Sequence, residues 1–150
     1  MARPADPPTA DRFTVEAAGL EPTGFSEVRG LEATAERRDV PLADLVPDWV
    51  ASLVGDGTVN RLVPVSPTLV LVRAADSDGT LRAWFDGYID GSVGARTVLV
   101  SLLDADGEAV ARWKCENAVP ERWVGPHLRT DRSTVAVESL ELAHDGVKRA

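Results

Sequence analysis

Residues 98–147 read VLVSLLDADGEAVARWKCENAVPERWVGPHLRTDRSTVAVESLELAHDGV, and their pattern indicates a series of strands. Residues 97–103 and 108–116 are rich in apolar and β-branched side chains. The run Asp104–Gly107 between them is typical of a tight hairpin turn. A connection with one tryptophan and two prolines follows, and residues 133–143 then form a closing strand. We predict antiparallel strands here, and nothing in the pattern points to catalysis.

The residues before this stretch contain further strand patterns. Residues 12–20 alternate between apolar and polar side chains, as expected of a half-buried strand. Residues 25–40 form a longer, charge-rich strand that we expect to be interrupted near Gly30, because glycine inside a strand often marks a bulge. Residues 68–74 are apolar enough to be a buried strand.

Two segments carry apolar residues at helical spacing. In residues 41–54 we expect a break at Pro47, with this proline opening a second short helix. The second helix begins after a cap at Ser77 or Asp78 and ends at Gly91. The two apolar stripes are Leu42, Leu45, Val46, Trp49, Val50 and Leu53 in the first segment, and Leu81, Trp84, Phe85, Tyr88 and Ile89 in the second. We predict that the second stripe packs its three aromatic residues on the sheet.

The fold class that follows is mainly β with one or two short helices: an antiparallel β-barrel or sandwich with a flanking helix. We expect residues 1–11, which are rich in proline, to be a flexible arm. Residues 12–150 are expected to form a single domain, in which residues 41–56 are an inserted arm with a helical pattern. A chain of 150 residues fits one domain of ordinary size.

Composition excludes several classes of function. With 24 acidic and 16 basic residues the formal charge is −8, which disfavours nucleic-acid binding, because phosphate neutralisation needs clustered basic residues. No apolar run reaches the roughly 20 residues of a membrane-spanning helix. The N-terminus lacks the apolar segment of a secretory signal. The single Cys115 cannot form an internal disulfide and agrees with a reducing compartment. We expect no membrane anchor and a cytoplasmic location.

We predict no catalytic, cofactor-binding or metal site. The runs Asp76–Gly79 and Asp104–Gly107 begin like calcium loops but lack the later ligands, so a helix cap and a hairpin turn explain them better. His127, His144 and Cys115 are too few for structural zinc, and His144 fits a structural role at a strand end. The motifs of nucleophile elbows, zinc-binding helices and phosphate loops are also missing from the sequence. We therefore do not expect an enzyme.

The four tryptophans divide into two groups. Trp84 and Trp113 fall in predicted elements, where core packing is the expected role. Trp49 and Trp123 lie outside the firmly predicted elements, and both core packing and contact with a partner chain stay open for them.

The closing strand has an unusual apolar pattern. Val135 and Val137 have one parity, while Leu140 and Leu142 have the other. An ordinary half-buried strand keeps its apolar side chains on one face. Either the strand bulges or both of its faces meet protein.

Blocks from both halves of the chain resemble the tail-tube proteins of contractile phage tails and contractile injection systems. The C-terminal half has that family's LLDxDGxxVARW hairpin, its N-A-x-P connection followed by Gly-Pro, and its E-x-L-E-L-A-H-x-G ending. The N-terminal half has the G-F-S-E-V-x-G-L-E opening. The matching positions are Gly24–Glu32, Leu102–Gly107, Val110–Trp113, Asn117–Pro120, Gly125–Pro126 and Glu138–Gly146. The resemblance implies a tail-tube-like fold, also seen in the haemolysin-coregulated proteins of type VI secretion.

The resemblance implies a structural subunit of an inner tube. Hexameric rings would join their sheets edge to edge around a lumen and stack into a rigid tube. Contraction of a sheath would drive this tube through a target envelope. The implied partners are other copies of this chain, the sheath protein, baseplate and spike hub proteins, and cargo in the lumen. Assembly into a phage-tail-like particle would take place in the cytoplasm.

One region departs from the family pattern. Typical members carry a charged, Gly-containing arm that helps to stack one ring on the next. Here the corresponding region, residues 37–61, contains the apolar run PLADLVPDWVASLVG. This run favours a specialised ring, such as a tube initiator or baseplate ring joining the spike hub to the tube, beside the main-tube interpretation. A monomeric β-barrel protein-binding module that docks through Trp49 and an enzyme with a scattered site are two further hypotheses.

We expect the subunit interfaces to include arm residues and apolar side chains near the closing strand. These residues are Arg37, Arg38, Leu45, Trp49, Leu53, Trp123, Val135 and Val137.

Overall fold

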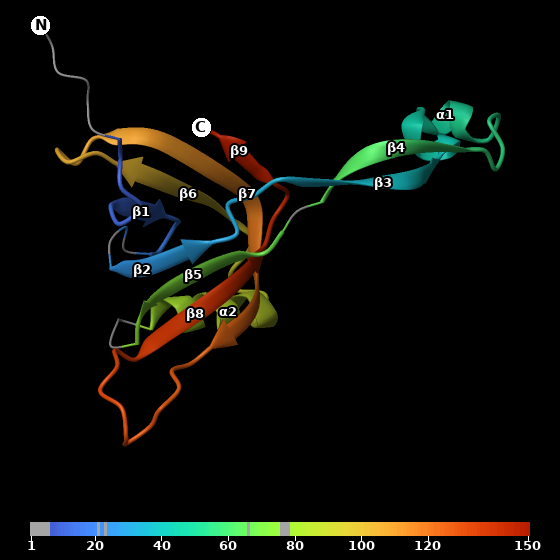
Figure 1. Ribbon diagram of the computed structural model, residues 1–150. Coiled ribbons are helices and arrows are strands. Elements are labelled where there is room, and N and C mark those ends of the chain that lie inside the picture. The colour runs from blue at the N-terminus through green and yellow to red at the C-terminus, as the bar shows by residue number, and fades with distance from the viewer. Residues whose placement is uncertain (1–6, 21, 23, 66, 76–78) are drawn as a thin grey trace, which may run out of the picture. The chain divides into compact units, whose positions relative to one another are not determined.

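The computed structural model describes residues 7–20, 22, 24–65, 67–75 and 79–150. The chain divides into two compact units, which are described separately (Figure 1). Residues 33–65 form the arm unit, and residues 1–32 and 66–150 form the body unit. Within the described residues, no helix has the length and apolar character needed to cross a membrane.

The body unit is built on a seven-stranded antiparallel sheet in the order β1-β6-β7-β8-β5-β2, with β9 also paired to β7. Strand β7 is long and serves two sets of partners. Its first half pairs with β6 and β9 and its second half with β8. Figure 1 shows β7 curving as it passes from one set to the other. The strands are β1 (Phe13–Glu16), β2 (Phe25–Arg29), β5 (Leu69–Ala74), β6 (Arg96–Leu103), β7 (Ala109–Val124), β8 (Val137–Ala143) and β9 (Val147–Arg149).

Asn117 lies two residues before β7 begins to pair with β8, and it has a left-handed backbone with φ of 53°. Asparagine tolerates this conformation better than most residues do. The side chain of Asn117 donates a hydrogen bond to Asp145 Oδ2, and the backbone N–H of Asp145 donates to the carbonyl of Glu116. The Asn-Ala-Val-Pro run predicted as a connection is therefore a bent part of a strand, and that prediction is wrong.

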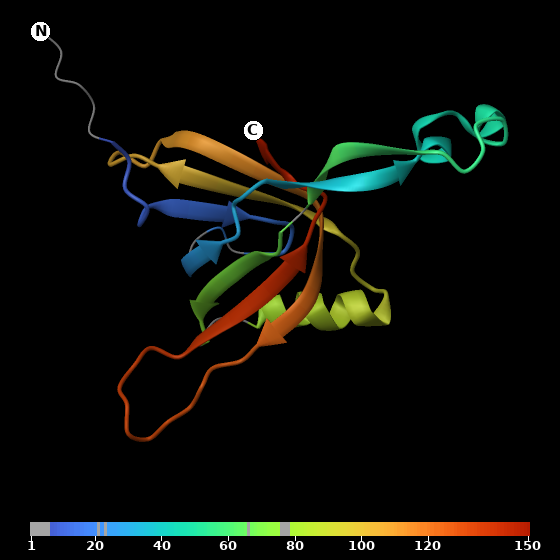
Figure 2. The same ribbon diagram turned by 45° about the vertical axis from the view of Figure 1, so that its right-hand side comes forward.

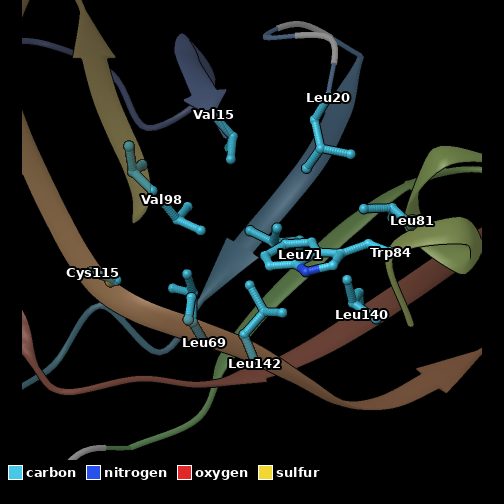
Figure 3. Packing of buried hydrophobic residues seen from close by; sticks show 12 residues of the cluster. Val15, Leu20, Leu69, Leu71, Leu81, Trp84, Val98, Cys115, Leu140 and Leu142 are labelled. Atoms are coloured by element: carbon cyan, nitrogen blue, oxygen red, sulfur yellow. The ribbon is translucent and has the colours of Figure 1, made fainter. Parts of the chain in front are cut away.

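The core of the body unit gathers around Trp84, whose side chain is 1% exposed. Trp84 comes from helix α2 (Thr80–Asp90), and Figure 3 shows its indole beside Leu71, Leu140 and Leu142. Gly91 ends this helix as predicted, with φ of 83°. The N-cap is Gly79, and the predicted caps Ser77 and Asp78 lie outside the described residues.

The aromatic stripe predicted for α2 is only partly correct. Leu81, Trp84 and Gly87 are buried, but Tyr88 and Ile89 are 40% and 69% exposed. Eleven residues make about three turns, and only the face that meets the sheet is covered. Trp113 is partly buried and packs against the core cluster, in line with the prediction.

Two strand predictions need correction. Residues 25–40 are interrupted near Gly30 as predicted, but the interruption separates two strands, β2 and β3 (Thr34–Pro41), and Gly30 lies between them with φ of 92°. A Cβ on Gly30 would lie 2.1 Å from the carbonyl oxygen of Thr68, so the close approach of this loop requires glycine. The closing strand β8 begins at Val137, and Val135 lies before it. Its buried residues Glu138, Leu140 and Leu142 share one face, so the strand is one-sided.

The arm unit is an antiparallel hairpin of β3 and β4 (Thr58–Val65) with two short helical pieces at its tip. These are the 3-10 helix η1 (Leu42–Leu45) and helix α1 (Asp48–Ala51). The predicted break at Pro47 is confirmed, and Pro47 is the N-cap residue of α1. No residue of the arm unit that the structure describes is buried.

Candidate interaction surfaces

The tip of the arm unit carries exposed apolar side chains. Trp49 and Leu53 are 78% and 77% exposed, and Leu45 is 40% exposed. The two helical pieces have four residues each, which is too short to cover these side chains. The tip is also acidic, because no basic residue occurs between Asp39 and Arg61 while three aspartates do: Asp44, Asp48 and Asp56. The predicted interface residues Leu45, Trp49 and Leu53 thus share one acidic, apolar tip.

The predicted interface residues Arg37 and Arg38 are neighbours in β3 and therefore point to opposite faces of the hairpin. Arg38 forms an ion pair with Glu36, with 3.1 Å between Nη2 and Oε2. Arg37 lies opposite Leu62 in the ladder. The two arginines do not form a single site.

Trp123 is held by its own subunit. Its Nε1–H donates to Glu138 Oε2 at 3.1 Å, and the guanidinium of Arg82 lies 4.9 Å from its ring centroid. Glu138 also accepts a hydrogen bond from Arg73 Nε at 3.1 Å, and both of these charged residues are buried. Pairing is what makes burial of the two charges tolerable. Only the part of Trp123 that these contacts leave uncovered is available to a partner.

The loop between β7 and β8 carries a second group of exposed apolar residues. Figure 2 shows this loop extending beyond the ends of the two strands. Leu128 is 77% exposed, Val135 is 78% exposed and Val137, at the start of β8, is 38% exposed. The predicted residues Val135 and Val137 therefore lie on the surface of the body unit.

Three strands of the body sheet have a single neighbour: β1, β2 and the short β9. Free edges carry unpaired N–H and C=O groups that can bind another strand. A cavity of about 450 Å³ lies beside β1 and β2, lined among others by Phe13, Val28, Leu31 and Trp113. The sequence reveals neither these edges nor this cavity, because a local pattern does not show which strands end a sheet.

Two neighbouring side chains of β7, Cys115 and Glu116, have shifted pKa values. Burial raises the pKa of the Cys115 thiol to about 11, so this thiol is protonated at neutral pH. A hydrogen bond from Lys114 and the charge of Lys148 lower the pKa of Glu116. Within the described part of the chain, no group of three or more His, Cys, Asp or Glu side chains is placed to hold a metal ion.

His144 lies at the end of β8, where it orders the turn that follows. Its Nδ1 accepts a hydrogen bond from the backbone N–H of Gly146 at 3.0 Å. The side chain is 7% exposed, and its buried Nε2 has no hydrogen-bond partner among the described residues. The Asp104–Gly107 run is a hairpin turn, as predicted, in which Asp104 Oδ1 accepts from the N–H groups of Asp106 and Glu108.

Comparison with known proteins connects this architecture to one family. The family model described as "T4-like virus tail tube protein gp19" matches residues 63–148. No curated protein sequence matches the chain.

Solved structures extend the comparison to nearly the whole chain. A chain of the PVC sheath-tube complex, an extracellular contractile injection system in its extended state, has 20% identity and a TM-score of 0.73; 96% of this chain and 91% of that chain are covered. A chain in the structure of the anti-feeding prophage cap, a tube-terminating cap, has 18% identity and a TM-score of 0.72, and the match covers 100% of this chain and 95% of that chain. Hcp1 from Flavobacterium johnsoniae has 8% identity and a TM-score of 0.53, with 93% and 94% covered. The predicted fold class is confirmed.

Proposed function

This chain belongs to the family of the T4-like virus tail tube protein gp19, and from that premise we propose that it is a structural subunit of the inner tube of a contractile injection system. In this proposal, six copies form a ring around a lumen, and rings stack into a rigid tube. The tube has a mechanical role: contraction of a surrounding sheath drives it through a target envelope.

The observation that carries the proposal is the set of edge strands in the body sheet. β1, β2 and β9 each have one neighbour in the sheet, although one backbone N–H of β1, that of Val15, already donates to the carbonyl of Pro22. Natural proteins rarely leave such edges bare, because they pair with other chains. A closed ring of identical subunits removes the problem, since every edge then meets the next copy. The apolar cavity beside β1 and β2 would be covered in the same step.

The arm tip supplies the contact between rings in this proposal. Leu45, Trp49 and Leu53 are exposed in the single chain, and their burial against another copy would remove a large apolar area from water. Val135, Val137 and the exposed part of Trp123 are candidate contacts of the body unit with a neighbouring copy.

The partners proposed are the sheath protein around the tube, baseplate and spike hub proteins at one end, and cargo in the lumen. The particle would be assembled in the cytoplasm. None of these roles needs an enzymatic activity.

Electron microscopy of the purified protein in negative stain, at high concentration, tests the proposal. We expect six-fold rings and stacked tubes. A field of monomers at every concentration would contradict it and favour the monomeric binding module. We also expect genes for sheath, baseplate and spike proteins to lie near the gene for this chain.

A second candidate is a specialised ring, such as a tube initiator or baseplate ring. The acidic, apolar tip favours it, since Trp49 and Leu53 are exposed there, whereas the resemblance implies a charged arm at this position. Such a ring contacts a different protein on one side. The same experiment separates the two candidates: single rings that never stack indicate the specialised ring, and long tubes indicate the main tube.

A further inference from the structure

The loop between β7 and β8, which extends beyond the ends of the two strands (Figure 2), surrounds a small hollow of about 160 Å³. We call this space the loop hollow. It is lined by four polar and two apolar residues of the loop: His127, Arg129, Arg132, Thr134, Leu128 and Ala136. All six are exposed, so a dissolved ligand can reach the loop hollow from the surrounding water.

The loop hollow is basic, although the chain as a whole is acidic. The chain has a formal charge of −8, but two arginines line the loop hollow and none of its described lining residues is an aspartate or glutamate. Two guanidinium groups that share one space repel each other, and an anion placed beside both would offset this repulsion. An anion that binds this acidic protein therefore has an electrostatic reason to bind here.

Arg129 is held in place by Asp131. Its Nε and Nη2 donate to the two carboxylate oxygens of Asp131 at 3.0 and 2.7 Å. Asp131 is not among the described residues that line the loop hollow. A guanidinium group has several N–H donors in one plane, and this ion pair uses only part of them. Asp131 thus offsets the charge of Arg129, orients its side chain and leaves the Nη1 donors available to a ligand.

Arg132 carries the charge that is left to be balanced. Within the part of the chain that the structure describes, the side chain of Arg132 has no ion pair or hydrogen bond, and those of His127 and Thr134 have no hydrogen bond. A planar guanidinium matches the oxygens of a carboxylate or a phosphate in shape and charge. An imidazole N–H and a hydroxyl can donate to the same oxygens. The donors of the loop hollow therefore fit an oxyanion.

We propose that the loop hollow is a binding site for the carboxylate or phosphate group of a small ligand. Arg132 supplies the unbalanced charge, the oriented Arg129 supplies further N–H donors, and His127 and Thr134 complete the set of donors. Leu128 forms an apolar wall, which fits a ligand with carbon atoms next to its anionic group. The volume of about 160 Å³ admits one such group with a few waters, since a water molecule takes about 30 Å³. This binding site goes beyond the proposed tube function and does not depend on it.

The two histidines of the chain allow binding to be measured at the site itself. His127 lines the loop hollow, whereas His144 is 7% exposed at the end of β8 and serves as an internal control. Nuclear magnetic resonance of their imidazole C–H signals follows both residues while the full chain, in dilute solution, is titrated with sodium phosphate, sodium acetate or sodium chloride. The pH and the ionic strength are kept constant. The His127 signal should shift and saturate with phosphate or acetate and shift much less with chloride, and the His144 signal should stay in place.

Two substitutions form a matched pair for the same titration. Arg132→Gln and Arg112→Gln each remove one charge from an exposed arginine, but Arg112 lies in β7 and outside the loop hollow. Arg132→Gln should weaken binding about tenfold, as expected for a lost charge-assisted hydrogen bond, and Arg112→Gln should bind as the wild type does. Arg132→Lys keeps the charge without the guanidinium fork, so its affinity should lie between those of the wild type and Arg132→Gln. Circular dichroism checks that each variant keeps the fold.

The two anions also distinguish the source of the oxyanion. Tighter binding of phosphate than of acetate assigns the loop hollow to a phosphate ligand, and the reverse order assigns it to a carboxylate; either result supports the inference. Equal shifts of the His127 signal in all three salts would overturn it, because the site would then respond to ionic strength alone. Equal binding by Arg132→Gln and Arg112→Gln would overturn it as well. Both of these outcomes leave the tube proposal intact, since electron microscopy of the wild type tests that proposal separately.

Discussion

The body unit and the arm unit are stabilised in different ways. The body unit buries Val15, Leu69, Leu71, Trp84 and other side chains in one cluster. The arm unit has an eight-residue ladder and a tip of short helices, but none of its described residues is buried. Since burial of apolar area is the main favourable term in folding, the body unit is expected to fold by itself. The arm unit instead leaves its apolar side chains exposed, and a second surface would be needed to bury them.

The largest effect on the free subunit should come from the centre of the body core. Trp84→Ala removes an indole that is 1% exposed, which should lower the free energy of unfolding by about 3–5 kcal/mol. Chemical denaturation followed by circular dichroism measures this loss. A decrease below about 1 kcal/mol would mean that the body unit does not depend on this core, and the proposed contrast between the body unit and the arm unit would be wrong.

A smaller loss is expected where the backbone needs glycine. Gly30→Ala places a Cβ 2.1 Å from the Thr68 carbonyl oxygen, at a residue with φ of 92°. The left-handed backbone alone costs about 1–2 kcal/mol, and relief of the contact must shift the loop further. Gly55→Ala is the matched control, because Gly55 also has positive φ, at 66°, but no atom lies within 4 Å of its added Cβ. Thermal unfolding should show a larger decrease in melting temperature for Gly30→Ala.

The pH dependence of stability should reveal the buried thiol of the body unit. Burial raises the pKa of Cys115 to about 11 from the ordinary value of 9.0, so the folded state holds its proton more tightly than the unfolded state does. This contribution is fully present below about pH 9 and is lost as the pH rises toward 11, by at most about 1.4 kcal/mol per pH unit. Unfolding in denaturant at several pH values measures the slope. Cys115→Ala should have a shallower slope over the same range.

The smallest effect on the free subunit is expected at the arm tip. Trp49→Glu replaces a side chain that is 78% exposed, so the unfolding free energy should change by less than about 0.5 kcal/mol. Assembly should nevertheless be blocked, because a charge would be placed in the proposed contact between rings. Circular dichroism and electron microscopy of the same sample separate the two effects. If the variant unfolds instead, the tip belongs to the subunit's own core, and the contrast between the units would be wrong.

Local patterns predicted the elements of the body well. The strand at residues 68–74, the hairpin turn at Asp104–Gly107 and the end of α2 at Gly91 all have local causes, namely runs of apolar residues and glycines at turns. Predictions failed where the cause was distant. Asn117 continues a strand because its side chain meets Asp145, 28 residues later, and the closing strand starts late, at Val137.

Apart from Arg37 and Arg38, the predicted interface residues are apolar side chains, and a prediction of this kind depends on local pattern alone. It identified Trp49 and Leu53, whose helical pieces are too short to cover them. It also included Trp123 without showing that Glu138 and Arg82 hold its ring. Sequence alone does not show that Arg38 and Arg61 lie opposite each other, because ladder partners depend on the register of β3 and β4.

The sequence by itself determined the class of fold, the order of most elements, the acidic charge and the family resemblance, because periodicity, turn residues and motif spacing are properties of neighbours along the chain. The tertiary structure decided which strands end the sheet, where β7 bends and which charges face each other across β3 and β4. These properties depend on hydrogen-bond pairing between segments far apart in sequence, and a register shift of one residue would reverse every face.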